Sequence, residues 1–400
     1  MDRENQATLR ISLDGEAIDA QQGDTIAAAL LRACVTTFTR SVKYHRPRGP
    51  FCLAGTCGQC LMRVDGVPSV LACRARAEEG MICERQNGPL GVDADLFRAA
   101  DFLFPEGLDH HHLLTGSRLL GRAAQEVARR LAGLGQLPAR VRESAAGEVR
   151  MARLVIIGAG TAGLAAAFEA GSQALLVERE SRPGGAALLF GAQPPPAPAC
   201  EMLLESECVG LYTNDTKLPG PALLAVRRAG HLLAIAAERV IVATGGASQP
   251  AQFAGVDRPG VYAARGLLGL PLRVGTRLAV VGDPDGSIEQ HQCAAALSRK
   301  GYEVFLCGIP RRALGNPVRA IDTADGERLR CDAVAVALPP APLHELGSSV
   351  GARARWDGAG FPLETDAEGR TSVAWLFAAG RAAAKPAAES GAAAGRAACL

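Results

Sequence analysis

The sequence of 400 residues lacks an excess of charge of either sign: 43 Lys and Arg residues stand against 41 Asp and Glu residues, a formal net charge of +2. Binding to nucleic acid or to an acidic membrane surface through overall charge needs a basic surplus, so these functions have no electrostatic support. No uninterrupted apolar run reaches the roughly 18 residues that predict a transmembrane helix.

The N-terminal stretch MDRENQATLR is polar and has no apolar core, so we do not expect a secretory signal in it. We therefore expect a cytoplasmic protein, with peripheral membrane association through a partner as an alternative. In a reducing compartment, the 12 cysteines indicate metal binding or simple burial in preference to disulfides.

What the chain does have fits a globular protein of two or three domains. A length of 400 residues exceeds one ordinary core. The hydrophobic fraction of 48% and the charged fraction of 21% are typical of a soluble protein.

Four cysteines near the N-terminus carry the clearest chemical signal. Cys52, Cys57 and Cys60 lie in CLAGTCGQC, and Cys73 follows in LAC. A C-x4-C-x2-C trio with one more cysteine downstream is the plant-type pattern for a 2Fe-2S cluster held by four thiolates. Structural zinc sites usually combine two short knuckles, and this region has one. The spacing therefore predicts a 2Fe-2S cluster.

The fourth ligand has a competitor. Cys73 ends the apolar run VPSVLAC, which predicts a strand that would hold the thiolate rigidly, whereas Cys83 follows the polar RAEEGM and is expected in a surface segment. We therefore prefer Cys73. The basic stretch SVKYHRPRG before the cysteine loop is either a solvated loop or a source of positive charge that favours cluster reduction.

The order of elements around these cysteines predicts a β-grasp ferredoxin-like domain over residues 1–87. Two alternating runs flank Asp14-Gly15, the strongest two-residue hairpin signal. A helix follows, with Asp24 as its expected N-cap and Cys34 as a small buried residue near its end.

Residues 88–150 predict a helical linker, because apolar residues recur there at helical spacing. They are Leu119, Leu120, Ala123, Val127, Leu131 and Leu134. The three adjacent histidines 110–112 do not predict a metal site, since neighbouring side chains point in different directions.

A nucleotide-binding fingerprint follows. The apolar run RLVII leads into Gly158, Gly160 and Gly163 of GAGTAG, then a helical run, and then a second strand that ends at Glu178. In this motif the glycines make the turn, admit the pyrophosphate and let the helix pack, while the helix N-terminus donates amides to phosphate. Glu178 is expected to accept hydrogen bonds from a ribose. The pattern predicts FAD or another adenine nucleotide.

Three later segments are predicted to complete the nucleotide site: the turn RPGG and the strand ends RVIVATGG and SVAWLFAAGR. Their candidate residues are Gly184, Gly185, Thr244, Gly245, Gly380 and Arg381. The alanine-rich helix after them is expected to be interrupted at Pro386 and Gly391.

A second fingerprint is degraded. In TRLAVVGDPDGSIEQ, Gly282 and Gly286 remain, but Pro284 and Ser287 stand where the second and third glycines belong, so NAD(P) binding is not expected. No close cysteine pair occurs in the nucleotide region, which argues against dithiol redox chemistry.

The combination of motifs resembles the α-subunits of heteromeric sarcosine oxidase and its relatives: hydrogen cyanide synthase, opine oxidase, and proline and hydroxyproline dehydrogenases. The similar segments are SVKYHRPRGPF, GAGTAGLAAA, ECVGLYTND, IVATGGASQPAQFAGVDRPGVY and LFAAGR. The resemblance implies an α/β fold in which a β-grasp 2Fe-2S domain precedes a Rossmann-like flavoprotein with two dinucleotide-binding domains. The expected divisions are 1–87 for the 2Fe-2S domain, 88–150 for the linker, 151–247 for the first FAD part, 248–340 for the inserted degenerate NAD(P)-like domain and 341–400 for the FAD return segment.

The resemblance also implies a function. A flavoprotein β-subunit in a hetero-oligomer would oxidise a C–N bond of an amine or amino acid. This chain would accept the electrons and pass them through its cluster to a quinone, a carrier protein or oxygen. In that superfamily an aspartate that binds the flavin ribityl chain stands where this chain has Arg381, and an arginine there fits a phosphate. The alternative is a non-catalytic electron-transfer scaffold whose adenine-nucleotide site is structural only. No motif assigns a catalytic acid or base.

Overall fold

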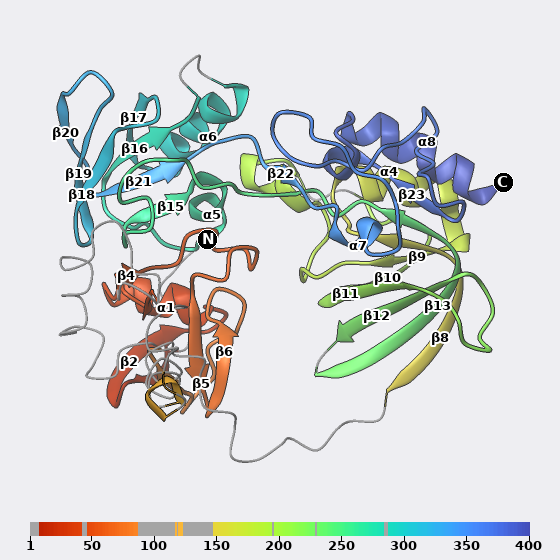
Figure 1. The fold of residues 1–400 in the computed structure, drawn as a ribbon, viewed down its shortest axis with the longest axis horizontal. Helices are drawn as coiled ribbons and strands as arrows, with labels where there is room; N and C mark the ends of the chain where they lie inside the picture. Colours follow the sequence, from red (N-terminus) through yellow and green to blue (C-terminus); the bar gives the residue numbers. More distant parts are fainter. Residues whose placement is uncertain are drawn as a thin grey trace. The chain divides into compact units, whose positions relative to one another are not determined.

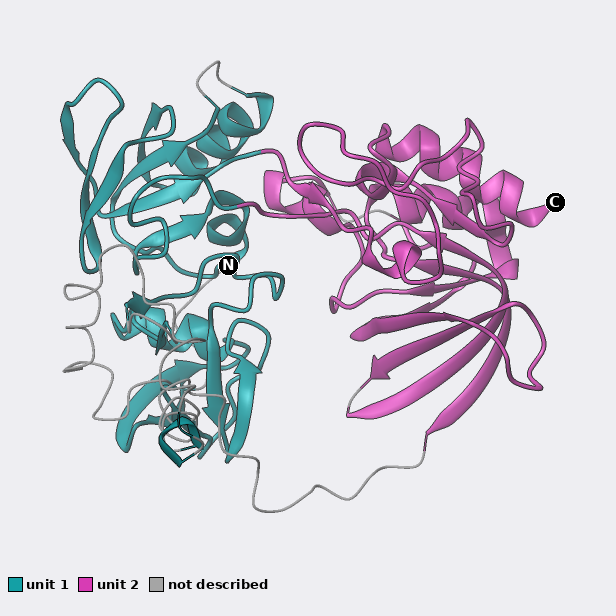
Figure 2. Ribbon diagram, viewed as in Figure 1, with its two compact units in different colours: residues 1–141, 250–338 teal, residues 142–249, 339–400 magenta. Residues whose placement is uncertain are grey.

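The computed structural model describes residues 8–41, 46–86, 117, 119–122, 147–193, 196–228, 230–283 and 287–400. The chain divides into two compact units: unit 1 contains residues 1–141 and 250–338, and unit 2 contains residues 142–249 and 339–400 (Figure 2). Most of the predicted linker, including the three adjacent histidines, lies outside the described residues, and so do Pro284 and Gly286.

The N-terminal part of unit 1 is a mixed five-stranded sheet in the order β2-β1-β7-β5-β6 together with helix α1, most of whose residues are buried (Figure 1). Its elements are β1 (Thr8–Leu13), β2 (Glu16–Gln21), α1 (Ile26–Arg32), β3 (Thr39–Arg40), β4 (Pro47–Arg48), β5 (Leu61–Val64), β6 (Val67–Leu71) and β7 (Ile82–Glu84). β1 pairs antiparallel with β2 and parallel with β7. The predicted hairpin is confirmed, because Asp14 and Gly15 have φ of 50° and 92°, as a type I′ turn requires.

Two expectations about α1 were wrong. The N-cap is Thr25, whose Oγ1 accepts a hydrogen bond from the Ala28 amide at 3.1 Å. Asp24 instead accepts from the Gln21 amide and forms an ion pair with Arg32 at 3.0 Å. Cys34 is exposed, because the chain turns into the left-handed region there, with φ of 61°, just after the helix ends.

The rest of unit 1 is an inserted domain built on a parallel sheet in the order β15-β21-β16-β17, with a three-stranded antiparallel sheet β18-β19-β20 beside it. Its elements are β15 (Val261–Ala263), α5 (Ala264–Gly269), β16 (Arg277–Val281), α6 (Ile288–Arg299), β17 (Glu303–Cys307), β18 (Arg312–Gly315), β19 (Val318–Asp322), β20 (Arg328–Arg330) and β21 (Ala333–Val336). The predicted strand, helix and strand are therefore present as β16, α6 and β17. In the small sheet, Asp322 forms ion pairs with Arg312 at 2.6 Å and Arg328 at 2.8 Å.

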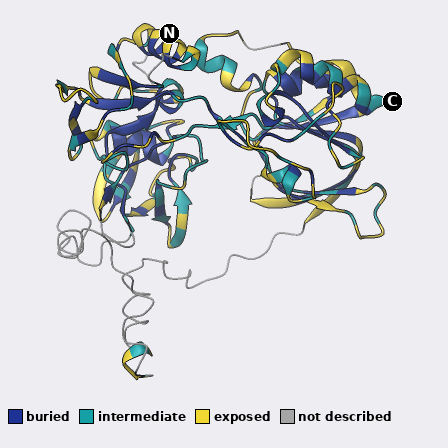
Figure 3. Ribbon diagram, turned by 45° about the horizontal axis from the view of Figure 1, so that its top comes forward, coloured by how far each residue is buried: buried dark blue, intermediate teal, exposed yellow. Residues whose placement is uncertain are grey.

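Unit 2 is built on a seven-stranded sheet in the order β10-β9-β8-β13-β12-β11, with β23 also paired to β13. Its elements are β8 (Glu148–Ile157), α4 (Thr161–Ala170), η2 (Gly171–Gln173), β9 (Ala174–Val177), η3 (Gly185–Phe190), β10 (Glu201–Leu203), β11 (Ser206–Thr213), β12 (Ala222–Arg228), β13 (His231–Val242), β14 (Gly246–Ala247), β22 (Ala341–Pro342), α7 (Glu345–Ser348), β23 (Leu376–Ala378), η4 (Gly380–Ala383) and α8 (Ala387–Cys399). Figure 3 shows buried residues along the strands, where the two apolar cores of this unit lie. Within the described chain, no helix is both long and apolar enough to cross a membrane.

Parallel pairing brings the predicted nucleotide segments to one edge of this sheet. The end of β8 at Ile157 lies opposite Val177 of β9 and Val242 of β13, and Val242 lies opposite Ala378 of β23. Because carboxyl ends of parallel strands meet at the same edge, the loops that follow β8, β9, β13 and β23 are neighbours.

Helix α8 continues through Gly391, where an interruption was expected. It packs so closely on α4 that a Cβ atom on Gly391 would lie 2.1 Å from the Ala162 carbonyl oxygen. A Cβ atom on Gly395 would lie 2.6 Å from the Ala166 carbonyl oxygen. These glycines therefore allow a helix–helix contact and do not end the helix.

Candidate functional site

The four predicted cysteine ligands come together in unit 1. Cys52, Cys57 and Cys60 lie in the loop before β5, and Cys73 follows β6. Thiol contacts connect Cys52 to Cys57, Cys52 to Cys73, and Cys60 to Cys73. Contact with Cys57 and Cys73 lowers the pKa of Cys52, and contact with Cys73 lowers that of Cys60.

The loop backbone is arranged to stabilise a thiolate at Cys52. The amides of Ala54 and Thr56 donate hydrogen bonds to Cys52 Sγ at 3.5 and 3.3 Å. Cys52 and Cys60 are each 1% exposed, so water is largely excluded from both sulfurs. Hydrogen bonds to sulfur and exclusion of solvent are the features by which proteins tune iron-sulfur clusters.

Cys83 lies apart from this group. It is fully buried in β7, the central strand between β1 and β5, so the expectation of a surface segment was wrong. Burial, with Asp65 and Asp14 nearby, raises the pKa of Cys83 to about 11, and none of the four loop thiols contributes to that shift. The polar run RAEEGM lies before β7 and includes the turn at Glu79 and Gly80, so its polarity does not extend to the strand that buries Cys83.

The donor set fits a two-iron cluster. The four thiols form a series of pairwise contacts, Cys57 to Cys52 to Cys73 to Cys60. A cluster with two irons takes two thiolates on each iron, so this series suits it better than one tetrahedral zinc ion.

Sequence reasoning missed Arg74, which follows Cys73 directly. A Cβ atom on Gly55 would lie 2.9 Å from both Cγ and Cδ of Arg74, so this side chain covers the loop between Cys52 and Cys57. The only sequence signal for it is a cation next to a predicted ligand.

The three glycines of the fingerprint in unit 2 have different surroundings. A Cβ atom on Gly163 would lie 1.7 Å from the Gly158 carbonyl oxygen, and one on Gly158 would lie 2.5 Å from the Ala243 carbonyl oxygen. The packing of α4 against β8 and β13 therefore accounts for these two. A Cβ atom on Gly160 would meet nothing within 4 Å. Gly160 borders open space at the N-terminus of α4, as a pyrophosphate site requires.

Glu178 and the RPGG turn lie against the same loop. The Glu178 carboxylate is 7% exposed and accepts hydrogen bonds from the amides of Ala159, at 2.6 Å, and Glu180, at 2.8 Å. The Gly184 amide donates to the Ala159 carbonyl at 2.8 Å, and a Cβ atom on Gly185 would lie 2.8 Å from the Gly160 Cα. Each carboxylate oxygen retains a lone pair for a ribose hydroxyl.

The ends of β13 and β23 complete this edge. Thr244 Oγ1 donates to the Leu343 carbonyl at 2.7 Å, and the Leu343 amide donates to the Gly245 carbonyl at 3.1 Å. A Cβ atom on Gly380 would lie 2.8 Å from the Ala162 Cβ, so Gly380 lies beside the first turn of α4. The segments that carry the ten predicted nucleotide-site residues therefore meet at one edge of the sheet.

The Arg381 side chain makes one hydrogen bond to the backbone and has a second nitrogen without a partner among the described residues. Its Nε donates to the Pro340 carbonyl at 2.7 Å, which holds the segment entering β22. Its Nη2 is buried and finds no hydrogen-bond partner among the described residues. A buried guanidinium nitrogen without an acceptor is costly, so this donor fits an oxygen of a bound ligand.

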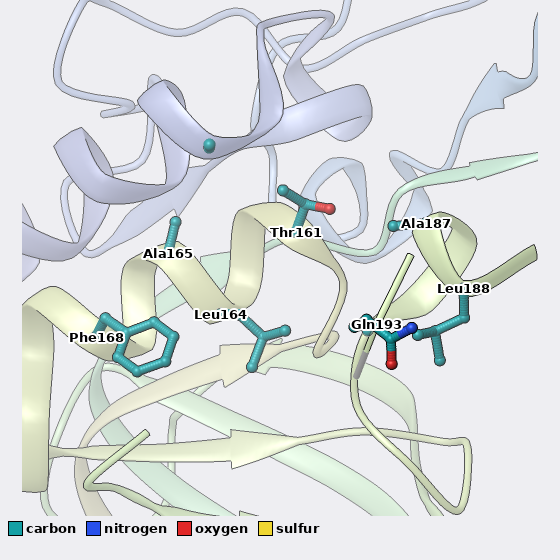
Figure 4. Close-up of a pocket in the computed structure, with 9 residues that line it drawn as sticks. Thr161, Leu164, Ala165, Phe168, Ala187, Leu188 and Gln193 are labelled. Atoms are coloured by element: carbon teal, nitrogen blue, oxygen red, sulfur yellow. The ribbon is translucent and has the colours of Figure 1, made fainter. Parts of the chain in front are cut away.

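A cavity of about 310 Å³ lies beside this edge, between α4, η3 and α8. Its lining is mostly apolar, and Figure 4 shows Leu164 and Phe168 on one side of α4, with Leu188 and Gln193 across from them. Thr161 and Gly184, which also line it, border the glycine loop. None of the described residues that line the cavity is charged.

In the inserted domain, a buried glutamine side chain joins α6 to the ends of β16 and β17. Gln290 of α6 is 2% exposed, and its Nε2 donates to the carbonyls of Val280 and Cys307, each at 2.9 Å. A Cβ atom on Gly282 would lie 2.5 Å from the Gln290 Cδ. Ser287, at the third glycine position, is the N-cap of α6, where its Oγ accepts from the Gln290 amide at 3.2 Å.

Fold and site together define a class: a 2Fe-2S ferredoxin-like domain joined to an oxidoreductase fold of the FAD and pyridine-nucleotide type. Residues 6–88 match the family described as 2Fe-2S iron-sulfur cluster binding domain. The predicted fold class is confirmed.

The comparisons with known proteins are more specific. Sarcosine oxidase subunit alpha of Rhizobium meliloti (strain 1021) is 29% identical over 294 residues, which are 64% of this chain and 29% of that subunit. Hydrogen cyanide synthase subunit HcnA of Pseudomonas aeruginosa is 29% identical over 83 residues, 21% of this chain and 79% of that subunit. The chain is therefore homologous to the sarcosine oxidase α-subunit and to HcnA, as its motifs predicted, and it spans less than a third of the former.

A solved structure covers nearly the whole chain. L-proline dehydrogenase from P. horikoshii superposes with a TM-score of 0.73 at 21% identity, over 99% of this chain and 73% of that chain. At this identity the likeness supports the arrangement of elements in the fold.

Proposed function

We propose that this chain is the iron-sulfur and FAD-binding α-subunit of a multi-subunit amine or amino-acid dehydrogenase or oxidase. In this proposal a flavoprotein β-subunit oxidises the C–N bond of the substrate. The α-subunit accepts the electrons and delivers them through its 2Fe-2S centre to a quinone, a carrier protein or oxygen. The observation that carries the proposal is the series of thiol contacts among Cys52, Cys57, Cys60 and Cys73.

The contacts suggest how the thiolates are shared. Cys52 and Cys57 would hold one iron, and Cys60 and Cys73 the other, because each of these pairs is in contact. The amides of Ala54 and Thr56 would keep Cys52 in its thiolate form. A cluster bound there would supply one-electron transfer, and a flavin on the sheet edge of unit 2 would supply exchange between two-electron and one-electron transfer.

The nucleotide site would be formed by the edge of the large sheet. The space at Gly160 and the amides of the α4 N-terminus would receive the pyrophosphate, and Glu178 would bind a ribose. Arg381 would place its free Nη2 on a ligand oxygen, in a role that an aspartate could not fill. FAD is the proposed ligand, with another adenine nucleotide as the alternative. The proposal that the inserted domain does not bind NAD(P) rests on Pro284 and Ser287, which stand where the second and third glycines belong.

The domain organisation belongs to the same proposal: 1–87, 88–150, 151–247, 248–340 and 341–400, as expected from the motifs. The names of both sequence relatives, each a subunit of an enzyme, support a hetero-oligomer, in which we propose a flavoprotein partner. We place the complex in the cytoplasm, with any membrane association through a partner.

A second function is favoured by one observation. Arg381 Nε is committed to the Pro340 carbonyl, so the residue that replaces the ribityl-binding aspartate acts first as a brace. This fits a non-catalytic electron-transfer scaffold in which an adenine nucleotide is bound for structure only.

One experiment separates the two functions. The complex is purified with its partner, nucleotides released by denaturation are identified, and flavin bleaching is followed when amino acids and amines are added to the chain alone and to the complex. The main proposal expects FAD in this chain and bleaching in the complex only. Bleaching by substrate in the isolated chain would refute the division of labour, and an adenine nucleotide without flavin would favour the scaffold.

A further inference from the structure

The first half of the cysteine loop packs against the inserted domain of unit 1. The Phe51 carbonyl accepts a hydrogen bond from the Ala263 amide at 2.9 Å. Phe51 and Cys52 are 2% and 1% exposed and belong to one apolar core with side chains of the inserted domain, including Val261 and Ala279. This contact therefore joins parts of the chain that lie more than 200 residues apart in sequence.

The contact extends along the segment that leads into the loop. A Cβ atom on Gly49 would lie 3.2 Å from the Pro259 Cα, so this backbone runs close to the inserted domain. Arg48 forms an ion pair with Asp257 at 3.6 Å, and the two side chains are 33% and 21% exposed. The loop is thus held from Arg48 to Cys52 by apolar burial, a backbone hydrogen bond and charge.

Gly266 of α5 sets how closely the loop can approach. A Cβ atom at this position would lie 2.4 Å from the Cys52 carbonyl oxygen and 3.1 Å from the Leu53 Cβ. Leu53 already has a φ of 52°, in the left-handed region, so the loop has little freedom to move away without strain. A glycine inside a helix is otherwise unfavourable, by about 1 kcal/mol relative to alanine. The close contact with the cysteine loop explains why a glycine stands at position 266.

We propose that the inserted domain supports the iron-sulfur loop by packing against it, and that Gly266 is the positioning residue that fixes Cys52. Its α5 backbone lies directly against the Cys52 carbonyl, and Cys52 is 1% exposed. The inserted domain would thus support the loop that holds the cluster. This inference rests on the proposed cluster ligation by Cys52.

The test compares two glycine-to-alanine variants on the same helix. Gly266→Ala removes the space for the Cys52 carbonyl, whereas Gly269→Ala changes an exposed position of α5. The full chain is purified with its cluster, and three properties are measured: iron per chain, the EPR spectrum after reduction, and the rate of iron loss to a chelator. From the typical cost of overpacking, we expect Gly266→Ala to lose iron at least roughly tenfold faster, with an altered EPR spectrum. Gly269→Ala should match the native chain.

A milder variant keeps the test decisive if Gly266→Ala does not fold. Asp257→Asn removes a partly buried ion pair without steric change, and we expect iron loss about two- to fivefold faster. If both Gly266→Ala and Asp257→Asn keep iron and show EPR spectra as the native chain does, the proposal that the inserted domain supports the loop is refuted. Absence of a 2Fe-2S spectrum from the native chain would instead overturn the proposed function, so the two failures are distinguishable.

Discussion

Gly160 and Gly163 are three residues apart, and the structure predicts opposite consequences for the same substitution. In Gly163→Ala the new Cβ would lie 1.7 Å from the Gly158 carbonyl oxygen and 2.9 Å from its carbonyl carbon. Alanine would gain about 1 kcal/mol in an unobstructed helix, but relief of overpacking costs roughly 1–3 kcal/mol and backbone overlap lies at the upper end. We expect the free energy of unfolding of unit 2 to fall by about 2 kcal/mol.

In Gly160→Ala the new Cβ meets no atom within 4 Å. Gly160 is the N-cap of α4 with φ of −75°, so alanine can adopt its backbone conformation. A poorer N-cap costs roughly 0.5–1 kcal/mol, and reduced freedom of the unfolded chain returns roughly 0.4–1 kcal/mol. The stability of the ligand-free protein should therefore barely change. Nucleotide retention should drop, because the methyl group enters the space offered to the pyrophosphate.

The assay uses protein stripped of nucleotide for thermal and urea unfolding, and untreated protein for quantifying the nucleotide that denaturation releases. For a unit of this size, a loss of about 2 kcal/mol lowers Tm by roughly 4–8 °C, so Gly163→Ala is readily resolved. The reasoning is refuted if Gly160→Ala destabilises stripped protein as much as Gly163→Ala, or if it retains a full complement of nucleotide.

Three further predictions follow from single contacts. Cys57→Ser should abolish the visible and EPR spectra of the cluster while Cys83→Ser spares them, and a reversed result would show that the ligand set is wrong. Gly391→Ala should lower the unfolding free energy of unit 2 by about 1–3 kcal/mol in urea, since its Cβ would lie 2.1 Å from a carbonyl oxygen of α4; an unchanged midpoint would contradict the tight helix packing. Arg328 and Arg312 lower the pKa of Asp322 from 3.8 to about 2. Because the pKa is lower in the folded state, the two ion pairs stabilise the fold fully above about pH 4, and this stabilisation is lost as the pH falls toward 2. Asp322→Asn should remove this part of the acid dependence of unfolding, and identical pH profiles would count against the ion pairs.

Local signals predicted the parts of the site that depend on nearby residues. The hairpin at Asp14-Gly15 and the glycine loop at Gly158 were predicted because each requires a backbone conformation that few residues adopt at low cost. The choice of Cys73 over Cys83 as the fourth ligand stays a prediction, and one of the two reasons for it was wrong. Cys83 is fully buried, since strand order places β7 in the centre of its sheet, and no local pattern reports strand order.

The sequence by itself determined the spacing of the cysteines, the two dinucleotide-type repeats and the loss of glycines in the second, because these are properties of short segments. Tertiary structure decided which surfaces meet. Gly391 allows α8 to pack closely on α4, Gln290 joins α6 to the carbonyls of β16 and β17, and Gly266 contacts the loop at Cys52 from more than 200 residues away. Such contacts depend on how separate elements pack, and glycine and glutamine carry no local signal of the partner they will have.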